Sequence, residues 1–139
     1  MPQIRVVLTT ALTSAHYEFR KQQYIHAFTV LKTFGCTDFY IVEALAKEGP
    51  TFLDDYSQNV FYATVNDPDC KNQGVNESRT LLEALRFFNF EPDDMIIKLT
   101  GRHCLTSDYF LKTVALHGDC DAIISYCQGR WPSFEIGRA

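Results

Sequence analysis

The sequence Met-Ile-Ile-Lys-Leu-Thr-Gly-Arg-His at positions 95–103 carries the strongest indication of the fold. Apolar residues surround a single lysine, Lys98, which is typical of a strand that is covered on both faces. Side-chain alternation places Lys98 on one face with Ile96 and Thr100. Because an unpaired ammonium is costly to bury, Lys98 and Arg102 indicate an anion near the carboxyl end of a central strand. The alternative is an edge strand with Lys98 in solvent.

The composition is that of one globular domain, spanning residues 1–139, with 46% hydrophobic residues and a net charge of −4. The negative charge and the lack of any Lys/Arg run argue against a nucleic-acid surface. No apolar segment approaches the roughly 20 residues that span a bilayer, and no secretory signal is visible at the amino terminus. We therefore expect a cytoplasmic protein without a transmembrane segment.

The cysteines and histidines show no spacing of a metal site. The five cysteines are Cys36, Cys70, Cys104, Cys120 and Cys127. None forms a C-x-x-C pair, so we expect reduced thiols of an intracellular protein rather than a zinc or redox site. The histidines (His16, His26, His103 and His117) also lack ligand spacing among themselves, and we expect each of them to be a polar or helix-face residue rather than a metal ligand.

Apolar strand patterns alternate with helical patterns along the rest of the chain. Strands are predicted at 4–8, 39–42, 60–65 and 122–126, in addition to the strand that begins at Met95. Helices are predicted at about 15–34, 76–88 and 108–116, with one further turn near 52–56, whereas 128–139 shows no clear period. This order predicts an α/β fold: an open, mainly parallel sheet with helices on both faces.

Helix boundaries are predicted from capping residues and apolar periodicity. The predicted N-caps are, in chain order, Thr13 or Ser14, Asn76, and Thr106 or Ser107. Gly35 is expected to close the first helix. The second helix should bury Leu81, Leu82, Leu85 and Phe88.

Polar side chains gather where the predicted strands end, which is where open parallel sheets bind their ligands. The candidates are Thr9, Thr10, Glu43, the segment 72–76 and the segment 100–102. Residues 72–77 open a helix whose free N–H groups favour phosphate, although ordinary capping by Asn76 is the alternative. Glu43 can accept hydrogen bonds from a ribose or a base, or it is a solvated strand end. No P-loop, dinucleotide or α/β-hydrolase motif occurs.

Two acidic pairs have a different interpretation. Asp67-Pro-Asp69 has the D-x-D form that holds a divalent cation on a diphosphate, but Pro68 favours a turn. Asp93 and Asp94 precede their strand, so they are predicted to be turn residues in solvent at the opposite end of the sheet.

Several of these segments together resemble a known family. They are Thr-Thr-Ala-Leu-Thr at 9–13, an aromatic-rich helix at 16–34, Phe-Tyr-Ile-Val-Glu at 39–43, Asn-x-Gly-x-Asn-Glu at 72–77 and Ile-Ile-Lys-Leu-Thr-Gly-Arg at 96–102. Over roughly residues 3–127 the chain resembles the nucleotide-diphospho-sugar transferase (GT-A) fold. It is most similar to viral and bacterial glycosyltransferase-like proteins with a K-x-T-G-R strand end.

The resemblance implies a glycosyltransferase that binds a nucleotide-diphosphate sugar and transfers the sugar to an unknown acceptor, a glycan or a protein. Thr9, Thr10, Ala11 and Glu43 would surround the nucleoside, and Asn72, Gly74 and Asn76 would border the nucleotide and sugar. Lys98, Thr100, Gly101 and Arg102 would stand where many relatives have an acidic metal-binding D-x-D. This basic sequence disfavours a divalent metal cofactor (Mn²⁺ or Mg²⁺) and implies that cationic side chains neutralise the diphosphate.

The chain departs from the family in length, because only about a dozen residues follow the fifth predicted strand and the acceptor half is short or absent. Glu135 is the only carboxylate in that tail, and no catalytic residue is implied. One alternative is therefore a non-catalytic or truncated module that acts by binding or assembly, with room for a homo-oligomer. Another is a small α/β enzyme that acts on a phosphorylated metabolite.

Overall fold

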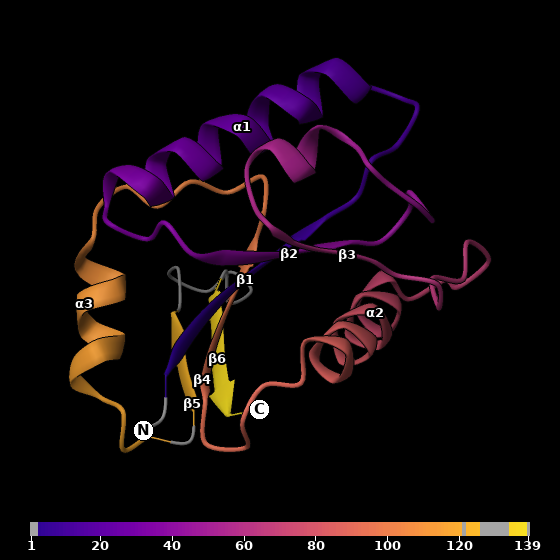
Figure 1. The fold of residues 1–139 in the computed structure, drawn as a ribbon. Coiled ribbons are helices and arrows are strands. Elements are labelled where there is room, and N and C mark those ends of the chain that lie inside the picture. The colour runs from indigo at the N-terminus through magenta and orange to yellow at the C-terminus, as the bar shows by residue number, and fades with distance from the viewer. Residues whose placement is uncertain (1–2, 121, 126–133, 139) are drawn as a thin grey trace.

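The computed structural model describes residues 3–120, 122–125 and 134–138. Six strands of this part of the chain form one sheet, in the order β3-β2-β1-β4-β6-β5, and helices lie against it (Figure 1). The strands are β1 (Ile4–Thr10), β2 (Phe39–Glu43), β3 (Asn59–Tyr62), β4 (Met95–Thr100), β5 (Ala122–Ser125) and β6 (Phe134–Arg138). The helices are α1 (Tyr17–Thr33), α2 (Gln73–Phe88) and α3 (Tyr109–Leu116), with a 3₁₀ turn, η1 (Phe52–Asp55). Strands β1 to β4 pair in parallel, as predicted.

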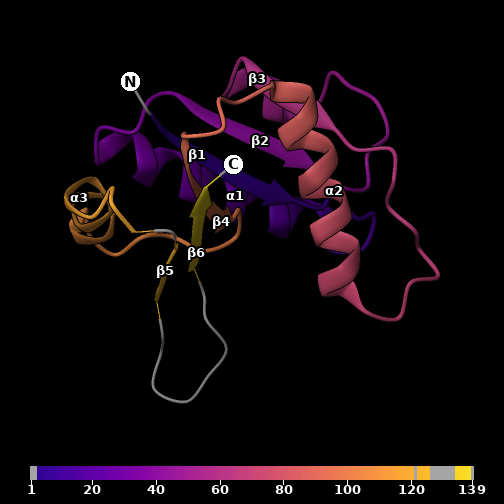
Figure 2. The same cartoon turned by 90° about the horizontal axis from the view of Figure 1, so that it is seen from below.

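Helices cover both faces of the sheet, which confirms the predicted α/β class (Figures 1 and 2). Alternate residues of each central strand face opposite sides, so Leu8 and Ile97 pack under α1 and α3, whereas Val7 and Ile96 pack under α2. The larger cluster includes Tyr24, Phe28 and Leu31 of α1, Val114 of α3, and Phe39 and Ile41 of β2. Both layers are needed, because parallel strands are apolar on both sides.

The strand order reverses between β1 and β4. From β1 the chain continues to β2 and then β3 on one side, and it returns to place β4 on the other side of β1. The register pairs Thr9 of β1 with Thr100 of β4, so the carboxyl ends of these two strands meet. Such a reversal is the usual ligand position in open α/β sheets.

The sequence pattern failed to predict β6, which forms part of the predicted aperiodic tail. This strand pairs antiparallel with both β4 and β5 and separates them. Strand β4 therefore has a neighbour on each side, which confirms a central strand and makes the edge-strand alternative wrong. The remaining tail residues 128–133 and 139, together with Tyr126 and Cys127, lie outside the described residues.

The predicted N-cap of α1 is wrong. His16 occupies the cap position in a left-handed conformation, with φ 60°, and makes no side-chain cap hydrogen bond. The Thr13 hydroxyl instead donates to the carbonyl of Ala15 at 2.6 Å. The prediction for Gly35 is confirmed, because it has φ +86° and its N–H donates to the Lys32 carbonyl at the end of the helix.

Helix α2 begins earlier than predicted. Asn72, rather than Asn76, is the N-cap, and its side-chain oxygen accepts hydrogen bonds from the N–H groups of Gly74 and Val75. The predicted buried face is also partly wrong, because Leu82 is 49% exposed while Ala84 is buried against the sheet. Two asparagines four positions apart are equally good caps locally, so packing decided between them.

The start of α3 and the end of β3 also differ from the sequence prediction. Asp108 is the N-cap of α3 without a side-chain cap bond, although the Ser107 hydroxyl accepts from the Tyr109 N–H at 3.3 Å. Strand β3 ends at Tyr62, three residues before the predicted end at Val65. Within the described residues no helix is long and apolar enough to cross a bilayer.

Asp94 was predicted to be solvated, and that prediction is wrong. Its side chain is 1% exposed and accepts hydrogen bonds from the Arg5 Nε and from the Gln3 N–H, both at 2.9 Å. Arg5 also donates to the Tyr40 hydroxyl at 3.2 Å and lies over the Phe90 ring. These contacts of Asp94 therefore hold the amino end of β1 against the amino end of β4.

This ion pair predicts an acid-sensitive contribution to stability. The hydrogen bond from Arg5 holds the pKa of Asp94 below its ordinary value. A depressed pKa stabilises the fold above the ordinary pKa of about 3.9, and this stabilisation is lost as the pH falls through the lower native pKa. We expect Asp94→Asn to lower the free energy of unfolding at pH 7, by an amount that shrinks steadily below pH 4. Urea unfolding over a pH series measures this, with exposed Asp93→Asn as the control; a pH-independent difference would contradict it.

Candidate functional site

A pocket of about 540 Å³ lies at the carboxyl ends of β1 and β4, where the strand order reverses. We call it the β1–β4 pocket. Its lining comes from the ends of these strands, from α1, from the first turns of α2 and from the loops after β1, β2, β3 and β4. Neutral polar residues of the lining include Thr9, Thr10, Thr13, Asn66, Gln73, Asn76, Thr80 and Thr100. Its charged residues are Arg20, Glu77 and Arg102, and His103 lies beside them.

The structure brings together many of the site residues that the sequence predicted. Thr9, Thr10, Ala11, Asn76, Thr100 and Arg102 all line the β1–β4 pocket. Lys98 lies immediately behind this lining, with a side chain that is 17% exposed. Glu43, Asn72, Gly74 and Gly101 are not among the lining residues.

Lys98 is paired within the chain. Its ammonium lies 2.8 Å from the Oε1 of Glu77 and 3.4 Å from the hydroxyl of Thr100. The same Glu77 oxygen accepts a hydrogen bond from the Thr9 hydroxyl at 2.8 Å. Burial works against ionisation of Glu77, but the hydrogen bond and charge of Lys98 outweigh it, so the pKa of Glu77 is lowered. The half-buried lysine is thus neutralised by a carboxylate that itself lines the pocket.

The turn after β4 positions Arg102 at the pocket. The N–H of Gly101 donates to the Thr9 carbonyl at 2.8 Å, and the N–H of His103 donates to the Thr100 carbonyl. A Cβ at position 101 would lie 2.8 Å from the Thr9 oxygen and 3.1 Å from the Tyr24 ring. Position 101 therefore requires glycine for lack of space, and its role is to let the ends of β1 and β4 approach closely.

Glu43 is a buried support behind the pocket. Its Oε1 accepts from the Thr10 hydroxyl at 3.0 Å and from the Leu12 N–H at 2.9 Å. Its Oε2 accepts from the N–H groups of Leu45 and Ala46 at 2.8 and 2.6 Å. Burial raises the pKa of Glu43, and these hydrogen bonds oppose the rise. The residue holds the loop after β1 to the loop after β2, and with 0% exposure it offers no surface to a ligand.

The residues at the start of α2 organise a loop. Asn76 is buried, and its amide donates to the Asn66 side chain and the Asp67 carbonyl, while its oxygen accepts from the Asp67 N–H. The Asp67 carboxylate accepts from the N–H of Asp69, which confirms that the D-x-D sequence is a turn. Neither aspartate lines the β1–β4 pocket.

Sequence reasoning missed Arg20 and Tyr24 of α1. The Tyr24 hydroxyl accepts from the N–H of Ala11 at 2.9 Å, and Arg20 donates to the Ala11 carbonyl at 3.3 Å. Both side chains hold the loop after β1, and both line the pocket. Arg20, Tyr24 and Phe28 follow one another at four-residue spacing and so lie on one face of α1. An arginine on the same face as buried aromatic residues could have indicated that Arg20 points toward the sheet and not into solvent.

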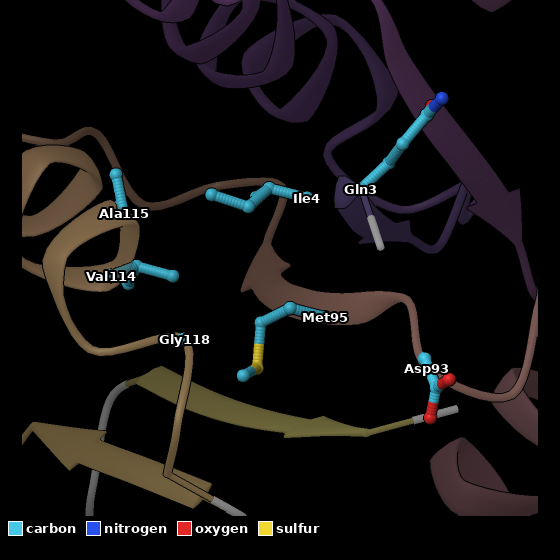
Figure 3. A pocket seen from close by; sticks show the side chains of 7 residues that line it. All are labelled: Gln3, Ile4, Asp93, Met95, Val114, Ala115 and Gly118. Carbon is cyan, nitrogen blue, oxygen red and sulfur yellow. The ribbon is translucent and has the colours of Figure 1, made fainter. Parts of the chain in front are cut away.

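A second pocket, of about 440 Å³, lies at the opposite, amino-terminal end of β1 and β4 (Figure 3). Its lining is largely apolar, with Ile4, Met95 and Val114 around it, and Asp93 is the one ionisable residue among the described residues that line it. Because convergent polar groups distinguish a ligand site, the β1–β4 pocket is the stronger candidate.

No protein-family model matches the chain, and no curated protein matches it. The resemblance to GT-A glycosyltransferases thus stays a prediction from the sequence motifs.

Proposed function

We propose that the chain binds a nucleotide-diphosphate sugar in the β1–β4 pocket and transfers the sugar to an acceptor hydroxyl. One observation carries the proposal: Arg20 and Arg102 line the pocket together with hydroxyl and amide groups at the point where the parallel strand order reverses, and Lys98, paired with Glu77, lies behind that lining. A pocket volume of about 540 Å³ falls within the range of small-molecule sites, roughly 300–1,000 Å³.

The local charge supports an anionic ligand. The chain as a whole has a net charge of −4, yet among the described residues two arginines line the pocket against one carboxylate, Glu77, which is itself paired with Lys98. Arginine forms bidentate hydrogen bonds with phosphate oxygens, so Arg102 and Arg20 are suited to the diphosphate. The threonine hydroxyls and Asn76 are suited to hydroxyl groups of a ribose or sugar.

Cationic side chains also supply the chemistry that transfer needs. When the bond between the sugar and the diphosphate breaks, negative charge grows on the leaving diphosphate. Fixed positive charges beside it stabilise the transition state more than the ground state. In this proposal Arg102 and Arg20 take the part that a Mn²⁺ or Mg²⁺ ion plays elsewhere, while Lys98 offsets the charge of Glu77. The acceptor hydroxyl oxygen bonds to the sugar carbon as the bond to the diphosphate breaks, and the hydroxyl proton passes to the departing diphosphate.

Replacing Arg102 by methionine tests the cationic role. We expect about tenfold weaker binding of uridine or guanosine diphosphate, because a charge-assisted hydrogen bond contributes about 1.5 kcal/mol at a partly solvated site. Calorimetric titration measures the change. The control is Arg86→Met, an exposed arginine in the last turn of α2. Failure of the folded parent chain to bind any nucleoside diphosphate or nucleotide sugar would remove the proposal.

A second candidate function is a non-catalytic module that binds the nucleotide sugar without turning it over. The observation in its favour is that Glu77 is the only carboxylate in the described lining and is paired with Lys98, which leaves no free carboxylate there to act as a base. Incubation with nucleotide sugars and detection of released diphosphate separates the two. Tight binding without release, with and without acceptor sugars, would favour the module.

A further inference from the structure

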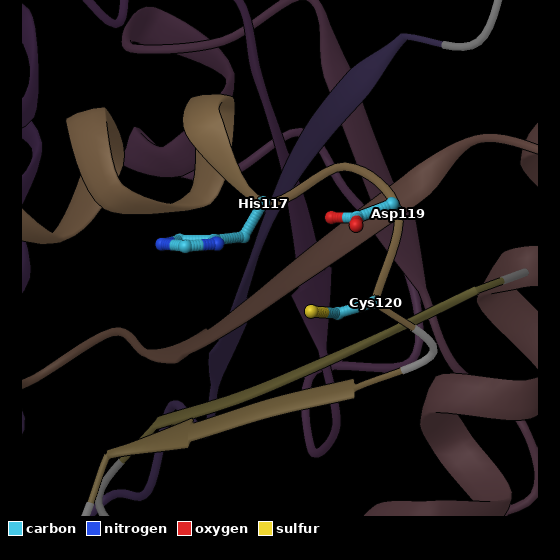
Figure 4. A group of neighbouring side chains, drawn as sticks. All are labelled: His117, Asp119 and Cys120. Atoms are coloured by element: carbon cyan, nitrogen blue, oxygen red, sulfur yellow. The ribbon is translucent and has the colours of Figure 1, made fainter.

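A short turn between α3 and β5 gathers three side chains with metal-binding atoms. The N–H of Cys120 donates to the His117 carbonyl at 3.1 Å, which closes the turn. His117, Asp119 and Cys120 project from it, and their ligand atoms all lie within 4.8 Å of one another (Figure 4). The three donors are an imidazole nitrogen, a carboxylate oxygen and a thiol sulfur.

None of these three side chains has a hydrogen-bond or ion-pair partner elsewhere in the described part of the chain. His117 and Asp119 are exposed and Cys120 is half-buried. No other interaction within the described residues fixes the rotamers of these three side chains, so they are free to turn toward a metal ion. In a tetrahedral zinc site, bond lengths of 2.0 to 2.3 Å place donor atoms about 3.5 Å apart, so side-chain rotations that shorten the separations by roughly 1 Å would complete the geometry.

We propose that His117, Asp119 and Cys120 bind one Zn²⁺ ion, with the fourth position open to water or another ligand. Thiolate and imidazole donors favour zinc over magnesium or calcium, which take oxygen ligands. Binding releases the thiol proton of Cys120 as the thiolate bonds to the metal. The ligand spacings sought in the sequence compare histidines only with histidines and cysteines only with cysteines. They could not reveal this group, because the group has one histidine, one aspartate and one cysteine.

The zinc site is separate from the proposed nucleotide site. The turn that carries it follows α3, and Gly118 of this turn lines the pocket at the amino ends of β1 and β4. The β1–β4 pocket lies at the carboxyl ends of the same strands. Zinc bound by these three residues would stabilise the turn that follows α3, and its binding does not depend on the nucleotide proposal.

The test is metal titration of the full chain after treatment with a chelator. We expect one equivalent of Zn²⁺ by calorimetry. Co²⁺, used as a spectroscopic substitute, should give the near-ultraviolet absorption of a cobalt–thiolate bond. Cys120→Ser should abolish that absorption and weaken Zn²⁺ binding at least tenfold, and His117→Gln should weaken it similarly.

Matched controls separate this site from other thiols and imidazoles of the chain. Cys104 and His103 lie outside the turn. The variants Cys104→Ser and His103→Gln should therefore retain both the cobalt–thiolate absorption and the Zn²⁺ affinity of the parent chain. Circular dichroism checks that each variant folds. The proposal is overturned if the parent chain shows no cobalt–thiolate absorption, or if Cys120→Ser binds Zn²⁺ as tightly as the parent.

Discussion

Glu43→Gln is expected to destabilise the fold by about 3 kcal/mol, because it leaves buried donors without acceptors. The Glu43 carboxylate accepts four hydrogen bonds, and three come from backbone N–H groups that can only donate. A glutamine has one oxygen, so its NH₂ group must face the N–H groups of either Leu12 or the pair Leu45 and Ala46. A loss of this size is large against a typical unfolding free energy of about 5–15 kcal/mol.

Urea denaturation of the parent and the variant measures the loss, which should appear as a lower midpoint with an unchanged slope. Glu48→Gln is the control, because Glu48 follows in the same connection to η1 and is exposed. The two variants should differ clearly. Equal midpoints for Glu43→Gln and the parent would mean that the carboxylate does not hold the two loops together.

Glu77→Gln and Lys98→Met are expected to change nucleoside diphosphate affinity in opposite directions. Removing the Glu77 charge leaves the Lys98 ammonium free for the phosphates and should tighten binding by about 1 kcal/mol, or roughly fivefold, after solvent and salt screening. Removing the Lys98 charge leaves Glu77 facing the phosphates and should weaken binding about tenfold or more. The two variants should therefore differ by about fiftyfold, while the parent lies between them.

The double variant Glu77→Gln/Lys98→Met completes the cycle, and its non-additivity measures the coupling of the pair. The control is Lys112→Met, which breaks the surface ion pair of Lys112 with Asp108 at 2.6 Å. This change should leave the affinity unaltered. If Glu77→Gln and Lys98→Met shift the affinity in the same direction, or not at all, the ion pair does not control the charge of the pocket.

The opposed signs would also separate a binding role for Lys98 from a purely structural one. The ion pair joins α2 to β4 across one face of the sheet, so breaking it from either side should reduce stability. Stability and affinity would then fall together in Lys98→Met, whereas Glu77→Gln would lose stability and gain affinity. Only a direct effect of charge on the ligand gives that second combination.

Local patterns in the sequence determined the α/β class and most of its elements. The strands are recognised from the apolar runs at 4–8, 39–42 and 95–100, and the helices from the helical periods between these runs. Both signals come from residues close together in the sequence. The alternation of strands and helices then predicts a parallel sheet with helices on both faces. The same patterns located Thr9, Thr100 and Arg102 at strand ends, and parallel pairing brought those ends together.

Only the tertiary structure decided which groups meet. The pairing of Lys98 with Glu77, the burial of Glu43 and Asp94, and the insertion of β6 beside β4 all join segments distant in sequence. A lysine within a strand carries no local signal of whether a carboxylate or a ligand will neutralise it. That outcome depends on how α2 packs over the sheet, because the energy of a charge is set by its neighbours in space and not by those along the chain.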